Sequence, residues 1–494
     1  MQAQLEGQLQ TSSLAGTALP QESAVETSVT ARENLTILRN IKIGTFHIGS
    51  SLADILATGV WNRIMIKELG FAATPIALLL ALRYFLAPFS IWVGARSDRT
   101  NWHGYRRLPY VWGGRLMMAL SYVLLGVATL ELAGGYDPSI KTFSLGLMNI
   151  TVTTNGDSVL GWLGIATALI MFCVGSVLSS TTFLSLIYDT TPPKQRTRAV
   201  SVVWFFLILG FAVAGIFYSR LLPEYTRDGF LSLFLIAPLA MMSIWVFSVI
   251  GEEKPIHRGT TTESSESLGS VWGEIKRAWQ NPHTQQFFLF LTLSTIFFYM
   301  QDVILEPFAG EVFNMPLSTT NRFSGYWGSM TLLGIVVSLF AARRWKKTVN
   351  NTSLSRWGVL TLIVTFILFV ICAAFQVRGF VTVGLITMGI GLGMWTVGSL
   401  GLMMDMTRAW GAGLYLALWT VASTLARGAG VASGGILLDF GSVLSANVAL
   451  AYAFVFGVQV VGFVASYVAL RKVNVEAFKQ ETAGRETVFA ATMD

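Results

Sequence analysis

The chain has 494 residues, of which 53% are hydrophobic and only 12% are charged. A water-soluble globular protein of that composition is implausible, so the composition favours a membrane protein. The formal net charge of +7 does not by itself indicate a nucleic-acid partner, because basic residues beside membrane helices usually report topology.

Twelve long apolar runs follow one another along the chain, six before and six after a polar stretch from about 251 to 282. Each run reaches the length of about 20 residues that a helix needs to cross a bilayer, and barrel strands would be shorter and alternating. The sequence therefore predicts an all-α polytopic membrane protein with two parallel six-helix halves. The predicted spans are 43–62, 72–95, 109–131, 159–188, 199–221, 229–250, 285–307, 322–342, 355–377, 380–404, 412–438 and 445–470.

The polar segments divide the chain further. Residues 1–42 read as a largely disordered tail, and residues 1–31 lack the basic residues and apolar run of a signal peptide. The halves are predicted at 43–250 and 285–470, with a linker at 251–284 and a second tail at 471–494. Within the linker, apolar residues between Val271 and Trp279 share one face at helical spacing. This pattern favours a short surface helix, with an extension of the seventh span as the alternative.

The distribution of basic residues predicts the orientation. Most of the 34 Lys and Arg residues fall in the tails and in the connections on the same side as the tails. Short cytoplasmic connections carry such an excess, so both termini are expected in the cytoplasm. The basic charge is then explained by topology, and a nucleic-acid partner is not expected.

Several ionisable residues fall inside predicted spans, where insertion of a lipid-facing charge costs roughly 2.5–3.5 kcal/mol. They are therefore expected to face the bundle interior. For Arg83 and Arg427, three alternatives are open: an ion pair with Asp54 or Asp302, contact with an anionic or carbonyl group of a ligand, or contact with helix-end carbonyls. The carboxylates could instead couple transport to protons. The candidates are His47, Asp54, Arg83, Asp302, Glu306 and Arg427.

Two short sequences recur six spans apart. Asp54-Ile-Leu in the first span matches Asp302-Val-Ile-Leu in the seventh, and Asp189 near the end of the fourth matches Asp405 near the end of the tenth. Parallel halves of this kind around a midplane cavity are typical of transporters. We expect Asp54 and Asp302 to lie at equivalent depths.

The connection after the second span carries a charged motif. Gly94, Asp98 and Arg99, followed by Arg106 and Arg107, resemble the Gly-xxx-Asp-Arg-x-x-Arg-Arg loop of the major facilitator superfamily, with an insertion before the arginine pair. An aspartate at a helix end among arginines can lock one state of a rocking bundle. The alternative is a plain positive-inside loop. We expect Asp98 to lie within hydrogen-bond reach of an arginine or a helix N-terminus.

Within that superfamily, the sequences at 62–70, 86–89, 94–99 and 105–112 resemble the PucC/LhaA family. That resemblance implies delivery of bacteriochlorophyll or chlorophyll during assembly of light-harvesting complexes in a phototroph. It implies light-harvesting polypeptides or pigment-synthesis enzymes as partners, and an inner, intracytoplasmic or thylakoid membrane. One departure is His47, where the family is expected to have Gln. Another is a polar segment at about 134–158, which looks like an insertion without an obvious role.

No motif for an enzyme or a metal centre was found, and no cofactor is required. A neutral imidazole can ligate chlorophyll magnesium, so His47 is a candidate axial ligand. A lone histidine on a helix is more often a hydrogen-bonded residue that lines a cavity. Two hypotheses therefore remain: a factor that delivers (bacterio)chlorophyll or a precursor, and a proton-coupled transporter of a small organic solute.

Overall fold

A computed structural model describes residues 36–86, 89–99, 102–134, 141–145, 148–152, 159–192, 195–253, 282–345, 349–406 and 412–478. The predicted surface helix between Val271 and Trp279 lies outside these residues.

The first span is an interrupted helix. Thr36 caps the N-terminus of α2 (Ile37–Gly44), because its hydroxyl accepts a hydrogen bond from the Arg39 backbone N–H. After α3 (Phe46–Ile55), two π-helical segments follow, η1 (Leu56–Trp61) and η2 (Ile64–Glu68). Segments of this type are frequent at functional sites. The span therefore begins before and ends beyond the predicted 43–62.

The other spans also follow the predicted order. In the first half they are α4 (Ala73–Phe85) with α5 (Phe89–Arg99), α6 (Leu108–Gly134), α7 (Val159–Thr190), α8 (Arg196–Leu221) and α9 (Arg227–Val249). In the second half they are α11 (Pro282–Tyr299) with α12 (Gln301–Phe313), α13 (Leu317–Thr320) with α14 (Phe323–Arg344), α15 (Asn351–Phe375), α16 (Gly379–Asp405), α17 (Ala412–Leu444) and α18 (Val448–Lys472).

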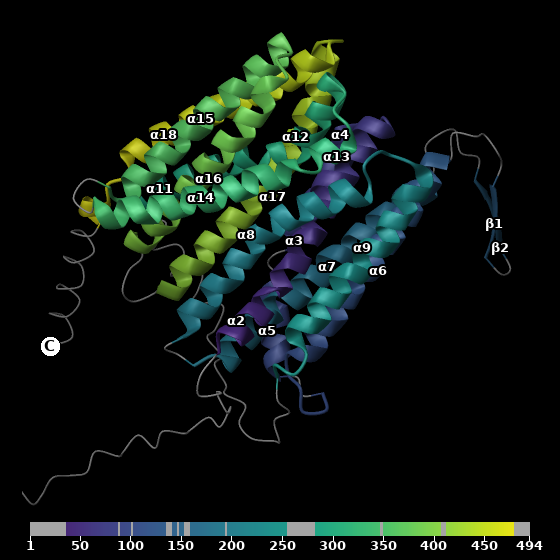
Figure 1. Cartoon of the computed structure of the whole chain (residues 1–494), viewed down its shortest axis with the longest axis horizontal. Coiled ribbons are helices and arrows are strands. Elements are labelled where there is room, and N and C mark those ends of the chain that lie inside the picture. The colour runs from purple at the N-terminus through teal and green to yellow at the C-terminus, as the bar shows by residue number, and fades with distance from the viewer. Residues whose placement is uncertain are drawn as a thin grey trace, which may run out of the picture.

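Two helical bundles lean against each other, one running from purple to teal and the other from green to yellow in Figure 1. In the part of the chain that the structure describes, ten helices are long and apolar enough to cross a membrane. The first two spans are not among them because they are divided into shorter helices, including the apolar α4. The all-helical, two-half membrane fold is confirmed.

The polar segment at 134–158 contains two antiparallel strands, β1 (Lys141–Leu145) and β2 (Met148–Val152). The sequence analysis described this segment only as an insertion without an obvious role. Because successive spans reverse direction, this β-hairpin marks one end of the bundle, which we call the hairpin end. The opposite end carries Thr36, the start of α6 and the residues after α9, and we call it the tail end.

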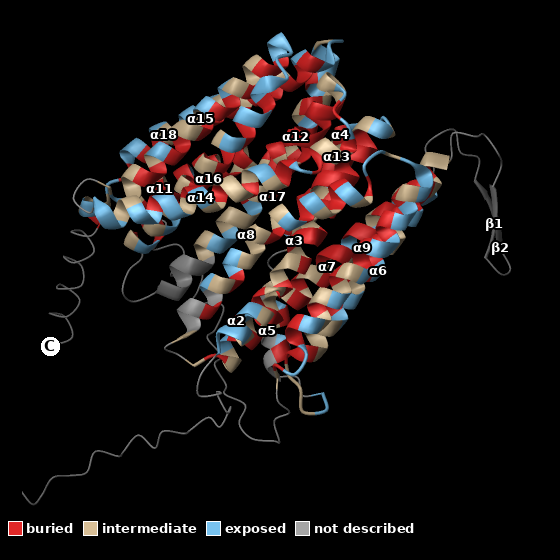
Figure 2. Cartoon of the chain, viewed as in Figure 1, coloured by how far each residue is buried: buried red, intermediate tan, exposed pale blue. Residues whose placement is uncertain are grey.

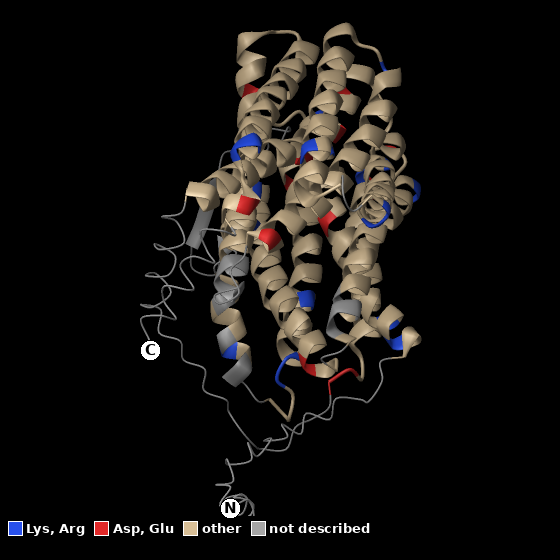
Figure 3. Cartoon of the chain, turned by 90° about the vertical axis from the view of Figure 1, so that its left-hand side faces the viewer, with Lys and Arg blue, Asp and Glu red and all other residues tan. Residues whose placement is uncertain are grey.

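Close contacts between helix backbones hold each half together. A Cβ atom added to Gly114 on α6 would come within 2.5 Å of the Gly175 carbonyl oxygen on α7, so only glycine permits this approach. Buried residues lie mostly on the inward faces of the helices, whereas exposed ones lie outside (Figure 2). Charged residues are sparse along both bundles (Figure 3), and each one in the interior therefore needs a partner or a function.

Candidate functional site

Two arginines inside the bundle each form an ion pair with an aspartate of the same half. In the first half, Arg83 Nη1 on α4 lies 2.5 Å from Asp54 Oδ1 on α3. In the second, Arg427 Nη2 on α17 lies 3.4 Å from Asp302 Oδ2 on α12. Both arginines thus show the ion-pair geometry that was one of the three alternatives. A ligand contact by either arginine remains a prediction.

The two ion pairs meet where α4 faces α17. The guanidinium carbon of Arg83 lies 4.5 Å from the centre of the Tyr84 ring, and that of Arg427 lies 4.9 Å from the same ring. Arg427 also lies 4.1 Å from the centre of the Tyr299 ring. We call these six residues the central charge cluster: Asp54, Arg83, Tyr84, Tyr299, Asp302 and Arg427. Its formal charges cancel, which is the condition under which buried charges are tolerated.

Glu306 lies one helical turn beyond Asp302 on α12 and keeps only 7% of its surface exposed. A Cβ atom added to Gly59 in η1 would lie 3.8 Å from Glu306 Oε1, so the carboxylate faces the π-helical segment of the other half. Among the described residues, Glu306 forms no ion pair. A role of this carboxylate in proton coupling remains a prediction.

Hydrogen bonds join the halves at the hairpin end. Asn62 Nδ2 donates to the Val303 carbonyl oxygen at 2.7 Å, and Arg63 Nη2 donates to the Met315 carbonyl oxygen at 2.7 Å. Arg63 is 1% exposed and also pairs with Glu68 at 2.7 Å. A side chain at Gly310 would press on the Arg63 guanidinium, so the glycine makes room for it.

A second junction at this end caps a helix across the two halves. Asp439 of α17 accepts hydrogen bonds from the backbone N–H groups of Ala73 at 2.9 Å and Thr74 at 2.7 Å. These groups open α4, where a helix has unpaired N–H groups and favours negative charge. We call this junction and the contacts of Asn62 and Arg63 together the hairpin-end clasp.

The two helices of the second span differ in whether they reach the other half. Helix α4 packs on α17 across the interface and also on α7, whereas α5 packs on α7 in its own half. Helix α2, at the same tail end, packs on α8 and α9. The halves thus meet through the hairpin-end part of the second span and through the contact of α8 with α14, whereas the tail-end part of the second span belongs to one half.

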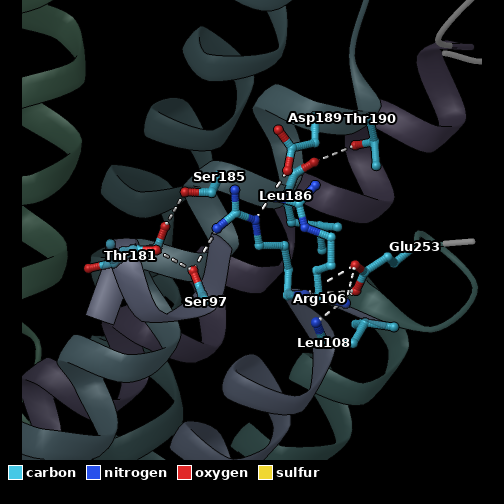
Figure 4. A network of polar contacts seen from close by, with 11 residues as sticks. Ser97, Arg106, Leu108, Thr181, Ser185, Leu186, Asp189, Thr190 and Glu253 are labelled. Atoms are coloured by element: carbon cyan, nitrogen blue, oxygen red, sulfur yellow. Dashed lines mark hydrogen bonds and ion pairs between the residues drawn. The ribbon is translucent and has the colours of Figure 1, made fainter. Parts of the chain in front are cut away.

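Polar contacts at the tail end tie together helices of the first half (Figure 4). Arg107, just before α6, lies 3.1 Å from Asp189 Oδ2 near the end of α7, and its Nη1 donates to Ser97 Oγ at 2.6 Å. Glu253 accepts from the backbone N–H groups of Arg106 and Leu108, each at 2.8 Å. Glu253 therefore caps the N-terminus of α6.

The neighbouring Glu252 holds α2. Its carboxylate lies 2.6 Å from Arg39 Nε and 3.0 Å from Lys42 Nζ. The sequence analysis assigned both glutamates to the linker at 251–284. In the structure, they belong to the packing of the first half.

The remaining motif residues are placed as follows. Gly94 of α5 lies against Thr181 of α7, with 3.7 Å between a Cβ added to the glycine and the Thr181 methyl carbon. The side chains of Asp98 and Arg99 lie outside the described residues, so the expected partner of Asp98 stays a prediction.

The recurrence of Asp189 and Asp405 corresponds to recurring contacts. Asp189 ends the fourth span and pairs with Arg107 at the start of the third. Asp405 ends the tenth span and accepts from Asn351 Nδ2 at 2.8 Å at the start of the ninth. The same helix ends are thus joined in each half, once by an ion pair and once by an amide. The equivalent depth of Asp54 and Asp302 remains a prediction.

Arg115 on α6 is 2% exposed and has no carboxylate partner among the described residues. Its guanidinium carbon lies 4.2 Å from the centre of the Phe46 ring and 4.4 Å from that of Trp245, and Nη1 lies 3.3 Å from Met118 Sδ. A desolvated cation–π contact contributes about 2 kcal/mol, whereas burial of one ion costs several kcal/mol. The two rings therefore do not fully offset the burial of this charge.

His47 lies beside this arginine. Its ring lies 5.7 Å from that of Phe46 and 5.5 Å from that of Phe183, both edge to face. The buried Nδ1 atom has no hydrogen-bond partner in the described part of the chain. This ring nitrogen could therefore contact a ligand. Ligation of chlorophyll magnesium by His47 stays a prediction. Within the same part, no cluster of His, Cys, Asp or Glu could hold a metal ion.

Sequence reasoning missed several of these residues. Arg115 lies inside the predicted span 109–131 and has the same signal as Arg83, a charge within an apolar run. Asp439 falls at the end of a predicted span, where an acid is ordinary. Nothing local distinguishes Asn62 or Arg63, because their partners are carbonyl groups more than 200 residues away.

The profile of the family described as PUCC protein matches residues 60–478. The chain is 25% identical to the protein PucC of Rhodovulum sulfidophilum, over 83% of this chain and 87% of that protein. It is 27% identical to the bacteriochlorophyll synthase 44.5 kDa chain of Rhodobacter capsulatus, over 86% of this chain and 93% of that one.

The fold resembles that of solved transporters. The crystal structure of a bacterial homolog of the human lysosomal transporter Spinster superposes with a TM-score of 0.63 at 12% identity, over 91% of this chain and 98% of that one. The nucleoside transporter NupG superposes with a TM-score of 0.61 at 12% identity, over 89% and 99%. The chain therefore belongs to the PUCC protein family, and its fold is similar to that of these solved transporters.

Proposed function

We propose that this protein binds a (bacterio)chlorophyll or a late precursor inside its two-half bundle and delivers it during assembly of light-harvesting complexes. The observation that carries this proposal is the family match over residues 60–478. Its partners are then light-harvesting polypeptides or pigment-synthesis enzymes. The protein acts without catalysing a reaction and resides in the pigment-forming membrane of a phototroph.

The interior of the bundle supports this proposal. Aromatic rings and charged groups lie together on the inward faces, at the central charge cluster and around Arg115. A tetrapyrrole is a large apolar ring with polar groups at its edge, and such a ligand needs both kinds of contact. His47 would supply an axial nitrogen to the pigment's magnesium.

The proposed direction of access follows from the packing. The hairpin-end clasp joins the halves, whereas α2 and α5 pack within the first half at the tail end. We place the tail end in the cytoplasm, because most basic residues lie there. Pigment would then enter from the cytoplasmic side or from the adjoining leaflet.

Deletion of the gene in its phototrophic host tests the proposal. We expect the level of light-harvesting complexes to fall while total pigment synthesis continues, and a plasmid copy of the gene to restore the complexes. Unchanged complex levels would refute a role in assembly.

A second candidate function is proton-coupled transport of a small organic solute. The observation that favours it is Glu306, a buried carboxylate at the interface of the halves that forms no ion pair among the described residues. Proton-dependent solute uptake into vesicles that contain the wild-type protein, lost in Glu306→Gln, would support this function.

A further inference from the structure

We propose that Arg115 anchors the acidic group of a ligand inside the first half, between α3, α6 and α9. This inference rests on the proposed function and narrows the pigment to a tetrapyrrole with a free propionate carboxylate. An unesterified pigment has such a group, and a fully esterified one does not.

The first observation is the way in which Arg115 is held. Phe46 and Trp245 lie 4.2 Å and 4.4 Å from its guanidinium carbon and occupy the space around the group with aromatic rings. A ring face is at best a weak hydrogen-bond acceptor, so neither ring replaces a carboxylate or carbonyl oxygen. Of the five N–H donors of an arginine, one group meets only the weak acceptor Met118 Sδ, and Nε has no partner in the described part of the chain.

The second observation is that two neighbouring side chains are also unsatisfied. His47 Nδ1 and Trp245 Nε1 are buried and have no hydrogen-bond partner among the described residues. Both belong to the ring contacts around Arg115, since His47 packs on Phe46 and Trp245 stacks on the arginine. Unpaired buried atoms also occur elsewhere in the described bundle, but these three come from three helices and belong to one set of ring contacts. Because buried polar atoms are normally paired, we take this grouping as the place of a missing partner.

The chemistry of these groups specifies that partner. A guanidinium binds a carboxylate through two parallel hydrogen bonds, and an indole N–H can only donate. The nearby carboxylate on the same helix as His47 is Asp54, which already pairs with Arg83 at 2.5 Å. An acceptor from outside the protein would satisfy Arg115. The surrounding rings suit an apolar macrocycle attached to that acid.

An anionic lipid offers similar chemistry through its phosphate, so the test separates the two sources. The full-length protein in nanodiscs of zwitterionic lipid is titrated with bacteriochlorophyllide and with its methyl ester, and binding is followed by pigment absorption and tryptophan quenching. We expect the free acid to bind at least about tenfold more tightly than the ester, as one charge-assisted pair implies.

In Arg115→Met, this preference should disappear while affinity for the ester is retained. Arg115→Lys should keep part of the preference for the free acid. This variant retains a positive charge and can be tested if Arg115→Met does not fold. The matched control is Arg356→Met, because Arg356 on α15 is another partly buried arginine whose Nε is unpaired in the described part of the chain. That variant should keep the full preference.

Equal binding of acid and ester by the wild type would overturn the inference and leave the proposed function intact. Binding of neither pigment would overturn both. Phosphatidylglycerol at low mole fraction is the third arm. Phosphatidylglycerol should not compete with the free acid for the wild-type protein. If the lipid displaces the free acid, binds more tightly than that acid, and loses this binding in Arg115→Met, the site binds a lipid headgroup and the inference fails.

Discussion

The two helices of the second span show how one membrane crossing serves two purposes. Helix α4 begins on the Asp439 carboxylate of the other half and packs on α17, whereas α5 packs on α7 within its own half. The hairpin end thus joins the halves through charge and backbone polarity. The described networks at the tail end instead stabilise the first half as a unit. Under the proposed function, this difference would let the halves separate at the tail end while they remain joined at the hairpin end.

The largest effect should come from the central charge cluster. Arg83→Met leaves Asp54, whose side chain is 30% exposed, without its cation. Loss of one partner of a fully buried pair costs about 3–5 kcal/mol, and the partial exposure of Asp54 lowers the expected cost to roughly 1–3 kcal/mol. We expect a fall of that size in the free energy of unfolding, measured by denaturant titration in detergent. The double variant Arg83→Met with Asp54→Leu should regain most of it. A single variant as stable as the wild type would show that this ion pair does not stabilise the fold.

At the hairpin end, Asp439→Asn should lower the free energy of unfolding by about 1–2 kcal/mol, because a charged cap on two backbone N–H groups is replaced by a neutral one. It should also increase the distance between spin labels on α4 and α17. Asp228→Asn is the matched control, since Asp228 lies exposed in the first turn of α9. If the two substitutions have equal effects, Asp439 does not help to hold the two halves together.

At the tail end, Glu253→Gln should have a smaller effect, about 1 kcal/mol, because it weakens a cap on α6 within one half. The expected signature is local. Hydrogen exchange should increase at the start of α6 while the distance between α4 and α17 stays constant. A change in that distance would mean that the two ends are coupled more tightly than the packing indicates.

Much of this fold follows from the sequence because lipid leaves few choices. Backbone groups must be satisfied within each span, so apolar length alone predicts the helices. The cost of an unpaired charge likewise predicts that Arg83 and Arg427 face inward. The same rule applies to Arg115, which the sequence analysis did not single out.

The partners could not be predicted in the same way. Arg63 binds the carbonyl group of Met315, and Asp439 binds the N–H groups of Ala73 and Thr74. Backbone groups are present at every position, so nothing in the sequence marks these as partners. These backbone groups become partners only because the folded helices bring them close to Arg63 and Asp439. The acidic pair Glu252 and Glu253 resembles an ordinary linker until its contacts with α2 and α6 are seen.

The smallest change is expected for His47, in the spectrum rather than in stability. If its imidazole ligates magnesium, His47→Ala should shift or weaken the band of bound pigment, and His47→Gln should retain it because an amide oxygen also binds a hard cation. The absorption spectrum of each purified variant measures this. An unchanged spectrum in the alanine variant removes His47 as the ligand and leaves pigment delivery standing.

Pigment binding by the wild-type protein tests the account most directly. The protein is purified from its phototrophic host in mild detergent, and absorption is recorded across the eluted peak. We expect a (bacterio)chlorophyll-type band that co-elutes with the protein in a fixed ratio. A pigment-free preparation, together with proton-dependent uptake of a solute into vesicles, would contradict the account and favour an ordinary transporter.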